Sequence, residues 1–393
     1  MRICMKVLQI DQHYQYGGGT EHYMLAMSAE LEKAGHEATI VYGKKGGHTL
    51  DKSGRKAIQV PYIEDYYPKM NRAMLKNLAE VIRQEKPNII HIHNIRNGDV
   101  VKTCASLAVT IRHVQDPSFV CLTHWKLLSN FDLCTDPLGF KCISRGCVKL
   151  RPGFFNLCRK NKEIQIHKKA SRILVSSCYV KWMLEQLSIS SKKIDVIHPF
   201  TDLPKVRPDT FSDENIVLFV GKMHPIKGVD FLVRALSQVD TDYKGIFVGE
   251  GEYLDSYKDL AKELGIEKKV EFTGWVPLER LSEYYAKCSV MIVPSIWVET
   301  FGLIGIDAMA YEKPVVAFDV GGIPEWLADK ETGFLVQRKD TKGMAEKISL
   351  LLKDKALAKK MGWAGRLKVE QEFTSGVFIK NLLEIYDKAL SEK

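Results

Sequence analysis

Residues 293–314 read VPSIWVETFGLIGIDAMAYEKP, a stretch that predicts the end of a strand, a loop and a helix. The apolar run 290–293 is typical of a buried strand, and the Pro-Ser pair after it ends that strand. A helix is expected over residues 301–311, stopping before Pro314. A strand, a loop and a helix in this order form the repeating unit of a parallel sheet covered by helices.

The loop and the first helical turn of this stretch carry groups that suit a sugar nucleotide. The backbone amides of residues 301–304 have no acceptor within the helix, and such amides bind anions, phosphate above all. Gly302 has no side chain where a ligand would approach, and the carboxylates of Glu299 and Asp307 flank these amides. The alternative interpretation is a buried amphipathic helix whose two carboxylates are solvated.

The 393 residues are enough for two domains, or three, and their composition is that of an ordinary globular protein. No apolar run is long enough to span a bilayer, and no signal peptide is expected. Nine cysteines without a secretion signal favour a reducing compartment, so a cytoplasmic location is expected.

The net charge of +9 is unevenly distributed. Residues 1–200 contain 30 Lys and Arg and 17 Asp and Glu, whereas the rest of the chain contains 27 and 31. A basic first half favours an anionic partner for that half. Nucleic acid is not expected as that partner, because the chain has no zinc-finger, RNA-recognition or helix-turn-helix motif.

Strand-like and helix-like segments alternate along the whole chain, which predicts an α/β fold of two doubly wound parallel-sheet domains. The seam is expected at residues 199–214, which contain three prolines. The expected domains are residues 1–200, with a Cys-rich basic insertion at about 130–160, and residues 206–372; residues 373–393 are expected to form a helix that returns to the first domain. The expected strands are residues 3–10, 37–42, 89–93, 118–123, 172–176 and 193–197 in the first half, and 216–221, 244–249, 270–273, 289–293, 314–317 and 333–336 in the second.

Chemically distinctive residues gather directly after the expected strands. In open parallel sheets, ligands bind beyond the carboxyl ends of the strands. If both sheets direct these ends at one cleft, the residues that face it are Gly17, Gly18, Gly19, His93, Asn94, His124, the loop 221–228 with Lys222 and Lys227, Gly249, Glu250, Gly251, Gly274, Glu299, Gly321 and Gly322.

Two of these loops indicate anion binding. Lys222 and Lys227 can neutralise a diphosphate, most of all while it departs with increasing charge, although both are alternatively surface lysines. The glycine run 17–19 precedes an expected helix and offers a second anion or hydroxyl site, or else a tight turn. No segment matches the nicotinamide or P-loop fingerprint.

Taken together, the motifs resemble those of the retaining glycosyltransferases of family 4, over nearly the whole chain. That resemblance implies the GT-B fold, in which two Rossmann-like domains face each other across a cleft. The pair Glu299 and Asp307 resembles the family's two glutamates separated by seven residues. The other matching segments are GGGTEHYMLAMSAELEKAGHEATIVYG, HIHN, THW, VGKMHPIKG, VGEGEY, FTGWV, GGIPEW and TGFLV.

The resemblance also implies roles for individual residues. Glu299 is expected to hold the donor sugar and Asp307 the ribose, while Lys222 and Lys227 hold the diphosphate. His124 is expected near the transferred sugar and the acceptor. The implied catalytic residues are His124, Lys227 and Glu299, and the implied substrate-binding residues are Gly18, Gly19, Asn94, Lys222, Gly249, Gly251, Gly274, Trp275, Thr300, Phe301, Gly302, Leu303 and Asp307.

Three positions depart from the family pattern. Asp307 replaces the usual Glu, Lys222 replaces the usual Arg, and Trp125 follows His124 where Asp is common. These differences leave the donor open, with a UDP-sugar favoured and a GDP-sugar as the alternative.

A metal is not expected at the diphosphate. The chelating pattern at residues 240–242, Asp-Thr-Asp, precedes an expected strand and is interpreted as a turn. A structural zinc is one hypothesis for the insertion, because four thiolates suit tetrahedral zinc; free or structural thiols are the alternative. The four cysteines are Cys134, Cys142, Cys147 and Cys158.

The expected reaction moves a sugar from a nucleotide-diphosphate sugar to a hydroxyl of a saccharide or lipid-linked acceptor, as in the synthesis of cell-surface polysaccharides or glycolipids, without metal and without a cofactor other than the donor. The anomeric configuration would be retained through an oxocarbenium-like transition state. Two alternatives remain open: a GT-B sugar-nucleotide epimerase, and a basic binding module without enzymatic activity.

Residues 141–172 predict peripheral contact with an anionic membrane, at the inner face of the cytoplasmic membrane. They include ten Lys and Arg against one acid, Glu163, and Phe154, Phe155 and Leu157 are interleaved with them. The alternative is a solvated basic face.

Overall fold

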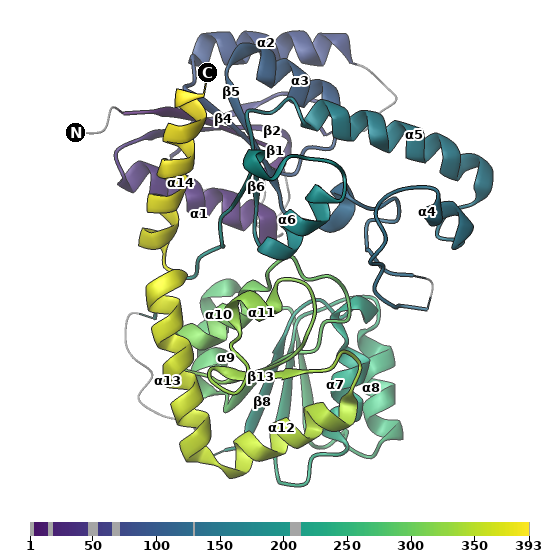
Figure 1. The fold of residues 1–393 in the computed structure, drawn as a ribbon. Helices are drawn as coiled ribbons and strands as arrows, with labels where there is room; N and C mark the ends of the chain where they lie inside the picture. The colour runs from purple at the N-terminus through teal and green to yellow at the C-terminus, as the bar shows by residue number, and fades with distance from the viewer. Residues whose placement is uncertain are drawn as a thin grey trace. The chain divides into compact units, whose positions relative to one another are not determined.

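The structure is a computed structural model of the chain, and it describes residues 4–14, 19–45, 54–64, 71–128, 130–204 and 214–392. It consists of two compact units, each built on one parallel sheet (Figure 1). Unit 1 comprises Met1–Lys126, Cys134–His198 and Phe378–Lys393, and unit 2 comprises Leu127–Leu133 and Pro199–Val377.

Unit 1 contains a seven-stranded sheet in the order β3-β2-β1-β4-β5-β6-β7, with every pairing parallel. Its strands are β1 (Lys6–Tyr14), β2 (Glu37–Lys45), β3 (Ala57–Gln59), β4 (Ile89–Ile92), β5 (Val109–Val114), β6 (Arg172–Val175) and β7 (Ile194–Val196). Its helices before the seam are α1 (Gly19–Lys33), α2 (Arg72–Glu85), α3 (Gly98–Leu107), α4 (Lys141–Ser144), α5 (Leu150–His167) and α6 (Cys178–Glu185).

One expected strand of this unit is wrong. Residues 118–123 form part of a short 3-10 helix, η1 (Pro117–Phe119), and a loop. The strand between β4 and β6 is instead β5, which, like β3, was not expected. The polar residues Arg112 and His113 disguised β5, although the whole strand is buried. Arg112 is accommodated there because its Nη1 donates to the carbonyls of Ile92 and His113, at 3.2 and 2.7 Å. His124 therefore follows η1 and a loop rather than the end of a strand.

Unit 2 contains a six-stranded sheet in the order β10-β9-β8-β11-β12-β13, again entirely parallel. The six strands expected in this half of the chain are all present: β8 (Ile216–Val220), β9 (Lys244–Val248), β10 (Val270–Gly274), β11 (Val290–Val293), β12 (Val315–Phe318) and β13 (Gly333–Val336). Its helices are α7 (Val229–Leu236), α8 (Leu254–Glu263), α9 (Leu278–Lys287), α10 (Leu303–Ala310), α11 (Ile323–Trp326), α12 (Thr341–Lys353) and α13 (Lys355–Glu372).

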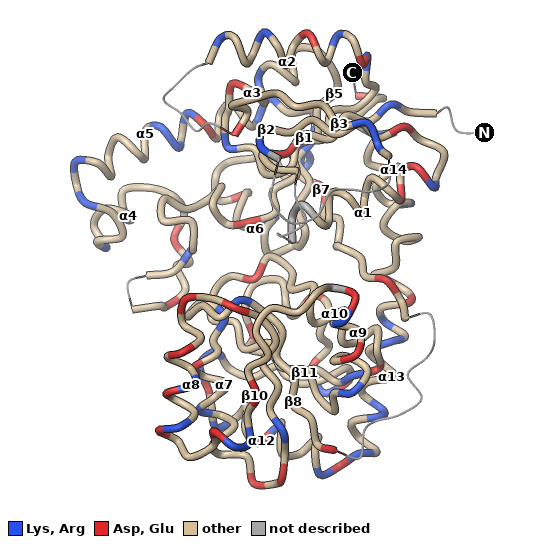
Figure 2. The backbone as a smooth tube through the Cα atoms, turned by 180° about the vertical axis from the view of Figure 1, so that it is seen from behind, with Lys and Arg blue, Asp and Glu red and all other residues tan. Residues whose placement is uncertain are grey.

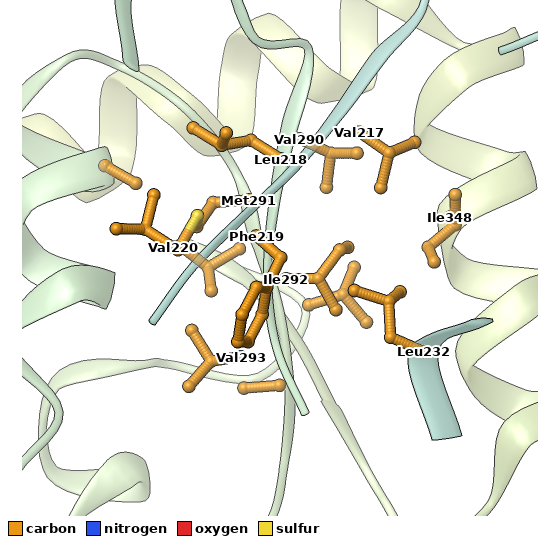
Figure 3. Packing of buried hydrophobic residues seen from close by; sticks show 14 of the residues in the cluster. Val217, Leu218, Phe219, Val220, Leu232, Val290, Met291, Ile292, Val293 and Ile348 are labelled. Atoms are coloured by element: carbon orange, nitrogen blue, oxygen red, sulfur yellow. The ribbon is translucent and has the colours of Figure 1, made fainter. Parts of the chain in front are cut away.

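The core of unit 2 explains why its strands were easy to identify. The four residues of β11 are completely buried, and side chains of α7 and α12, such as Leu232 and Ile348, pack in the same cluster (Figure 3). A parallel strand covered on both faces requires a continuous apolar run, because neither face meets water. Each such side chain contributes roughly 1.5–3 kcal/mol through burial.

Both sheets have the strand order of a Rossmann fold, and the direction of winding reverses at one point in each. In unit 2 this switch point lies between β8 and β11, and in unit 1 between β1 and β4. Ligands of doubly wound sheets bind beyond the carboxyl ends of the strands at such a point. The loops 221–228 and 294–302, which follow β8 and β11, are therefore positioned to form a site.

The chain crosses from unit 2 to unit 1 within the last helix, α14 (Ser375–Ser391). Tyr386 of α14 is fully buried, and its hydroxyl lies 2.7 Å from Nδ1 of His91 on β4. Near the end of the chain, Arg172 of β6 pairs with Glu392 at 2.9 Å. This helix is thus part of the packing of unit 1.

Candidate functional site

The centre of the candidate site in unit 2 is an ion pair between Glu299 and Lys227. Glu299 lies in the loop after β11, and Lys227 ends the 3-10 helix η3 (Pro225–Lys227) after β8. Lys227 Nζ lies 2.6 Å from Oε1 of Glu299, and Ser295 Oγ donates to the same oxygen at 2.5 Å. Glu299 is only 7% exposed, whereas a quarter of the Lys227 side chain is accessible.

Two opposing effects set the charge of Glu299. Burial alone would raise the pKa of its carboxyl, but the charge of Lys227 and hydrogen bonds from Lys227, Ser295 and Trp297 outweigh burial and lower the pKa below its ordinary value. Lys227 Nζ also lies 5.2 Å from the ring centroid of Trp297. Glu299 is therefore ionised at neutral pH, the form that accepts hydrogen bonds from hydroxyl groups.

Close backbone contacts fix this pair in place. Gly228 has a φ of 70°, and a Cβ at this position would lie 1.8 Å from the carbonyl oxygen of Pro294. A Cβ at Gly321 would lie 2.1 Å from the carbonyl oxygen of Glu299, which also accepts a hydrogen bond from Gly322 N at 2.8 Å. The glycines therefore allow the loops after β8, β11 and β12 to touch.

The glycines after β9 and β10 serve the same kind of contact. A Cβ at Gly249 would lie 2.0 Å from Gly221 O, and one at Gly251 would lie 2.4 Å from Met223 O. Gly249 N donates to Gly274 O at 2.9 Å. Trp275 follows Gly274 and is 66% exposed. Contact of these residues with a ligand stays a prediction.

The amino end of α10 lies directly after the Glu299 loop. The helix begins at Leu303, two residues later than expected, with Gly302 in a left-handed conformation at its N-cap. No side chain caps this end and no acidic residue occupies its first turn, so the positive end of the helix dipole is not compensated locally. Trp326 Nε1 donates to Phe301 O at 2.6 Å and holds the segment before the helix in place. Thr300 directly precedes Phe301 in this segment.

Asp307 lies on α10 but does not join the ion pair. Thr201 Oγ1, in the segment that enters unit 2, donates to Asp307 Oδ1 at 2.5 Å. Burial raises the pKa of Asp307 to about 6, with a further contribution from Asp202 that the Thr201 hydrogen bond opposes. Lys222 is exposed in the loop after β8. Ribose binding by Asp307 and diphosphate binding by Lys222 stay predictions.

In unit 1, the expected site residues follow β1, β4 and η1. Gly18 lies outside the described residues, and Gly19 begins α1. Asn94 follows β4, and its carbonyl accepts a hydrogen bond from Gln12. His124 has a φ of 70°, an uncommon conformation for a residue with a side chain, and its Nδ1 is buried without a partner among the described residues. Such backbone outliers are frequent at functional sites.

The electrostatic neighbours of His124 were not anticipated from the sequence. Burial first, then the charges of Arg96 and Lys160, lower the pKa of His124, and Asp116 acts in the opposite direction. His124 is therefore neutral at neutral pH and able to accept a proton or a hydrogen bond.

The potential metal ligands that lie close together are histidines of unit 1, not the cysteines of the zinc hypothesis. Within the described ranges, one group of His, Cys, Asp or Glu has all its ligand atoms within 4.8 Å, namely His91, His93 and His113. All three are buried, and burial and the charge of Arg112 are among the causes that lower each pKa, that of His113 to about 3. His91 Nε2 lies 3.3 Å from His113 Nδ1, so His91 and His113 form a hydrogen-bonded chain with Tyr386, whereas His93 Nε2 bonds to Gln9.

The cysteines expected to hold zinc are not among the groups of close metal ligands in the described residues, and zinc binding by them stays a prediction. Burial, followed by Cys134, Cys142 and Cys121, raises the pKa of Cys147. Cys158, by contrast, is exposed on α5. The Asp-Thr-Asp sequence lies in the connection before β9, where Asp240 pairs with Lys353 at 2.6 Å, as a structural turn would.

Several residues of the site were missed by sequence reasoning. Ser295 and Trp297 lie within the quoted stretch, but nothing in the sequence indicates that their side chains reach Glu299. Thr201 lies far from Asp307 along the chain, as Arg96 does from Lys160. Their proximity depends on packing that no local pattern reports.

Comparison with known proteins places these features among glycosyltransferases. The model of the family described as "Glycosyl transferases group 1" matches residues 204–368, and that of "Glycosyltransferase Family 4" matches residues 17–205. A D-inositol 3-phosphate glycosyltransferase of Nocardia farcinica is 33% identical over 255 residues, which are 60% of this chain and 56% of that protein. This chain thus spans little more than half of that relative. An N-acetyl-alpha-D-glucosaminyl L-malate synthase of Bacillus anthracis is 27% identical over 342 residues, 83% of this chain and 81% of the relative.

Solved structures with the same fold cover nearly the entire chain. A glycosyltransferase of Rickettsia africae aligns with a TM-score of 0.76 at 22% identity, covering 99% of this chain and 100% of the other. HepE of Anabaena, in complex with UDP and glucose, aligns with a TM-score of 0.74 at 17% identity, covering 98% and 100%. The expected GT-B fold, with its two Rossmann-like parallel-sheet domains, is confirmed.

Proposed function

The chain belongs to glycosyltransferase family 4, and we propose that it transfers a sugar from a nucleotide-diphosphate sugar to a hydroxyl group of a saccharide or lipid-linked acceptor, with retention of the anomeric configuration. The observation that carries this proposal is the pair of buried Glu299 and partly exposed Lys227 beside the amino end of α10, which no side chain caps. This arrangement supplies a hydroxyl acceptor, a cation and the backbone amides of the first turn of α10 within one loop cluster. A UDP-sugar is the favoured donor, in line with the UDP bound by HepE.

The chemistry places the greatest demand on the departing diphosphate. As the sugar–oxygen bond breaks, negative charge grows on the diphosphate and positive charge on the anomeric carbon. Lys227, the exposed Lys222 and the first amides of α10 would stabilise the diphosphate, and this electrostatic term needs no metal. Glu299, ionised and held by Ser295, would orient the sugar through its hydroxyl groups.

His124 and Asp307 complete the proposal. His124 is neutral at neutral pH and would accept a hydrogen bond from a hydroxyl of the acceptor or of the sugar. Asp307 would exchange its Thr201 partner for the ribose hydroxyls of the donor. Both assignments follow the family resemblance at matching positions of the chain.

Thermal-shift screening of nucleotide sugars is the first test. A ligand that binds only the native state increases the free energy of unfolding by RT ln(1 + [L]/Kd) and therefore raises the melting temperature. The best donor is then incubated with acceptor extracts, and the anomeric configuration of the product is read by NMR. Formation of a new sugar nucleotide without acceptor would instead support the epimerase, and salt-resistant RNA binding without any donor response would support the binding module.

A lysine variant makes this test specific. Lys227→Met should weaken UDP binding far more than it weakens binding of the free sugar, whereas Lys262→Met on the exposed face of α8 should leave both unchanged. EDTA should leave the rate intact. A strict requirement for Mg²⁺ or Mn²⁺ would contradict the metal-free mechanism.

Membrane contact is the second part of the proposal, and α4 and α5 would provide it. Among the described residues, no helix is both long and apolar enough to cross a bilayer. The α4–α5 corner nevertheless exposes Phe140, Leu150, Phe154 and Phe155 by 65, 66, 56 and 74%. Basic positions lie along the same elements (Figure 2). Such a combination favours reversible docking on the inner face of the cytoplasmic membrane.

The structure shows that several of the ten Lys and Arg side chains of residues 141–172 are paired or buried and so are less available to a membrane. Lys141 and Arg145 both pair with Asp136 at 2.9 Å, and Lys160 is buried beside Glu163. Arg172 is also buried. Lys149 and Arg151, exposed on either side of Leu150, are therefore the strongest candidates for contact with anionic lipids.

A further inference from the structure

Arg338 lies in the connection between β13 and α12, at the carboxyl end of a strand of the unit 2 sheet. The backbone on both sides of it is held in place. Asp319 N donates to Val336 O at the end of β13, and Asp340 caps α12 by accepting from Gly343 N at 2.8 Å. The Arg338 side chain is only 13% exposed, so its guanidinium is a fixed donor rather than a mobile surface charge.

One edge of this guanidinium faces the loop that carries Glu299. Arg338 Nε donates to the carbonyl oxygen of Ile296 at 2.8 Å. Ile296 N in turn donates at 3.0 Å to the carbonyl oxygen of Ile226, the residue before Lys227. Arg338 therefore holds the point at which the loops after β8 and β11 are hydrogen-bonded to each other.

The two neighbours of Ile296 contact the ion pair of the candidate site. Ser295 Oγ donates to Glu299 Oε1 at 2.5 Å, and the ring centroid of Trp297 lies 5.2 Å from Lys227 Nζ. Because planar peptide bonds join these neighbours to Ile296, the place of Ile296 determines where both side chains lie. A displaced Ile296 would weaken the hydrogen bond from Ser295, one of those that lower the pKa of Glu299.

The opposite edge of the guanidinium faces a hairpin formed by residues 127–133, which we call the 127–133 hairpin. These residues belong to unit 2, whereas the chain on either side of them belongs to unit 1. Leu127 pairs with Leu133 in an antiparallel bridge, and Leu133 packs against the core of unit 2. The hairpin is thus anchored to the unit that carries Glu299.

Arg338 and Lys339 bind the turn of this hairpin. One terminal nitrogen of Arg338 donates to Phe131 O, and the other lies 3.6 Å from Asp132 Oδ1. Lys339 Nζ lies 2.9 Å from the same oxygen of Asp132. The N–H groups of a guanidinium point in several fixed directions in one plane, so Arg338 can bind Ile296 and the hairpin at once, which an ammonium group cannot do.

We propose that Arg338 is a positioning residue for sugar transfer: it binds the Ile296 carbonyl at one edge and the 127–133 hairpin at the other, and thereby keeps Glu299 in the orientation that receives the donor sugar. The role of Glu299 in this inference rests on the proposed transferase function. The inference also gives the start of the Cys-rich insertion a task, namely to anchor the guanidinium.

The first test needs neither donor nor turnover. The carboxyl-carbon NMR resonance of Glu299, assigned by its absence in Glu299→Gln, reports the pKa of this residue during a pH titration. Arg338→Met keeps a long side chain but removes its donors, and should raise the pKa of Glu299 by roughly half a pH unit to one pH unit, as for one weakened hydrogen bond. Lys353→Met removes a cation paired with Asp240 elsewhere in unit 2 and is the matched control, with an unchanged pKa of Glu299.

Two further variants separate the edges of the guanidinium. Arg338→Lys keeps the charge near Asp132 but cannot donate in two directions, so it should raise the pKa of Glu299 as Arg338→Met does. Asp132→Asn removes the ion pair and leaves the bond to Ile296, so it should raise this pKa less. A wild-type pKa in Arg338→Lys would overturn the proposal, and a wild-type pKa in Asp132→Asn would overturn the part that concerns the hairpin.

Kinetics with the identified donor distinguish a positioning role from a merely structural one. Arg338→Met should lower kcat by roughly 10-fold, in line with one lost hydrogen bond in the site. UDP affinity should stay at the wild-type value, because UDP lacks the sugar that Glu299 orients. A wild-type kcat would overturn the proposal, and so would a loss of UDP affinity in step with kcat, which would show general damage to unit 2.

The two proposals fail in different ways. A raised pKa of Glu299 in Arg338→Met, in a chain that transfers no sugar from any donor, would support the placement of Glu299 by Arg338 and refute the transferase. An unchanged pKa of Glu299 and an unchanged kcat in Arg338→Met would refute the positioning role while the transferase stands.

Discussion

At the scale of single residues, the site depends on a carboxylate that is buried yet ionised. Glu299 keeps its charge because Lys227 and Ser295 converge on one of its oxygens. Neither partner alone would offset the cost of burial, since a buried carboxylate needs both charge compensation and hydrogen bonds. A substitution that preserves shape but removes charge therefore isolates the electrostatic role.

Glu299→Gln should reduce kcat/KM by roughly 10-fold to 100-fold, the value of hydrogen bonds that involve a charged group. The fold should survive, because the residue lies in a loop and its size is preserved. Steady-state kinetics with the identified donor measure the effect, with the exposed Glu263→Gln on α8 as control. Unchanged kinetics in Glu299→Gln would remove this residue from the mechanism.

Asp307 gives a prediction about pH. Because burial raises its pKa to about 6, the folded state binds a proton here more tightly than the unfolded state does. Stability contributed by this group is thus complete below about pH 4 and is lost as pH rises to about 6, by at most about 3 kcal/mol at about 1.4 kcal/mol per pKa unit. UDP binding should change in the opposite sense and strengthen above pH 6, where the carboxylate can accept ribose hydroxyls.

Asp307→Asn should therefore melt at a higher temperature than the wild type at pH 7 and at nearly the same temperature at pH 4. It should also bind UDP more weakly at pH 7. Calorimetric melting and UDP titration at both pH values measure the two effects. A variant less stable than the wild type at pH 7 would show that the Thr201 hydrogen bond outweighs burial.

At the scale of elements, apolar runs predicted most of the fold. The strands of unit 2 were recognised because most are short buried apolar runs, β10 being the partly exposed exception, whereas β5 was missed because Arg112 and His113 interrupt its pattern. Glu299 and Lys227 were identified from their places after strands. Their contact, and the roles of Ser295 and Thr201, depend on side-chain packing across loops, which sequence periodicity does not encode.

The α4–α5 corner gives a prediction about membrane binding. Vesicles containing anionic lipid should sediment the wild type at low salt and release it at high salt. Phe155→Ser and the double charge reversal of Lys149 and Arg151 to Glu should each weaken this binding. Trp363→Ser, an exposed aromatic residue on α13, is the control. Equal binding to neutral and anionic vesicles would show that the corner serves another purpose.

The insertion gives a prediction about zinc. If its cysteines hold a metal, elemental analysis should find about one zinc per chain. Cys147→Ser should then lower the zinc content, and Cys178→Ser, at an exposed cysteine of α6 outside the group, should not. Protein purified without chelators that contains no zinc would identify the group as ordinary thiols.

At the scale of the whole molecule, the same strand order occurs twice, and the last helix links the end of the chain to its beginning. The second sheet is complete before α14, whereas unit 1 requires that helix. Phe378, Leu382 and Tyr386 are buried in unit 1, so the first unit becomes complete only when the residues of α14 are present. A substitution at a buried position of α14 should therefore destabilise unit 1 more than unit 2.

Leu382→Ala should destabilise unit 1 by about 2–5 kcal/mol, the usual cost of deleting a fully buried leucine side chain. Tyr386→Phe should cost about 1–3 kcal/mol, because it leaves buried His91 without its partner. Lys380→Ala, on the exposed face of the same helix, is the control. Urea unfolding should be monitored by hydrogen exchange of the backbone amides. In Leu382→Ala and Tyr386→Phe, the amides of β4 and β5 should lose protection while those of β8 and β11 keep it. UDP should still bind. Equal loss in both sheets would mean that the two units unfold as one cooperative body, so that the C-terminal helix stabilises the entire chain rather than the first unit.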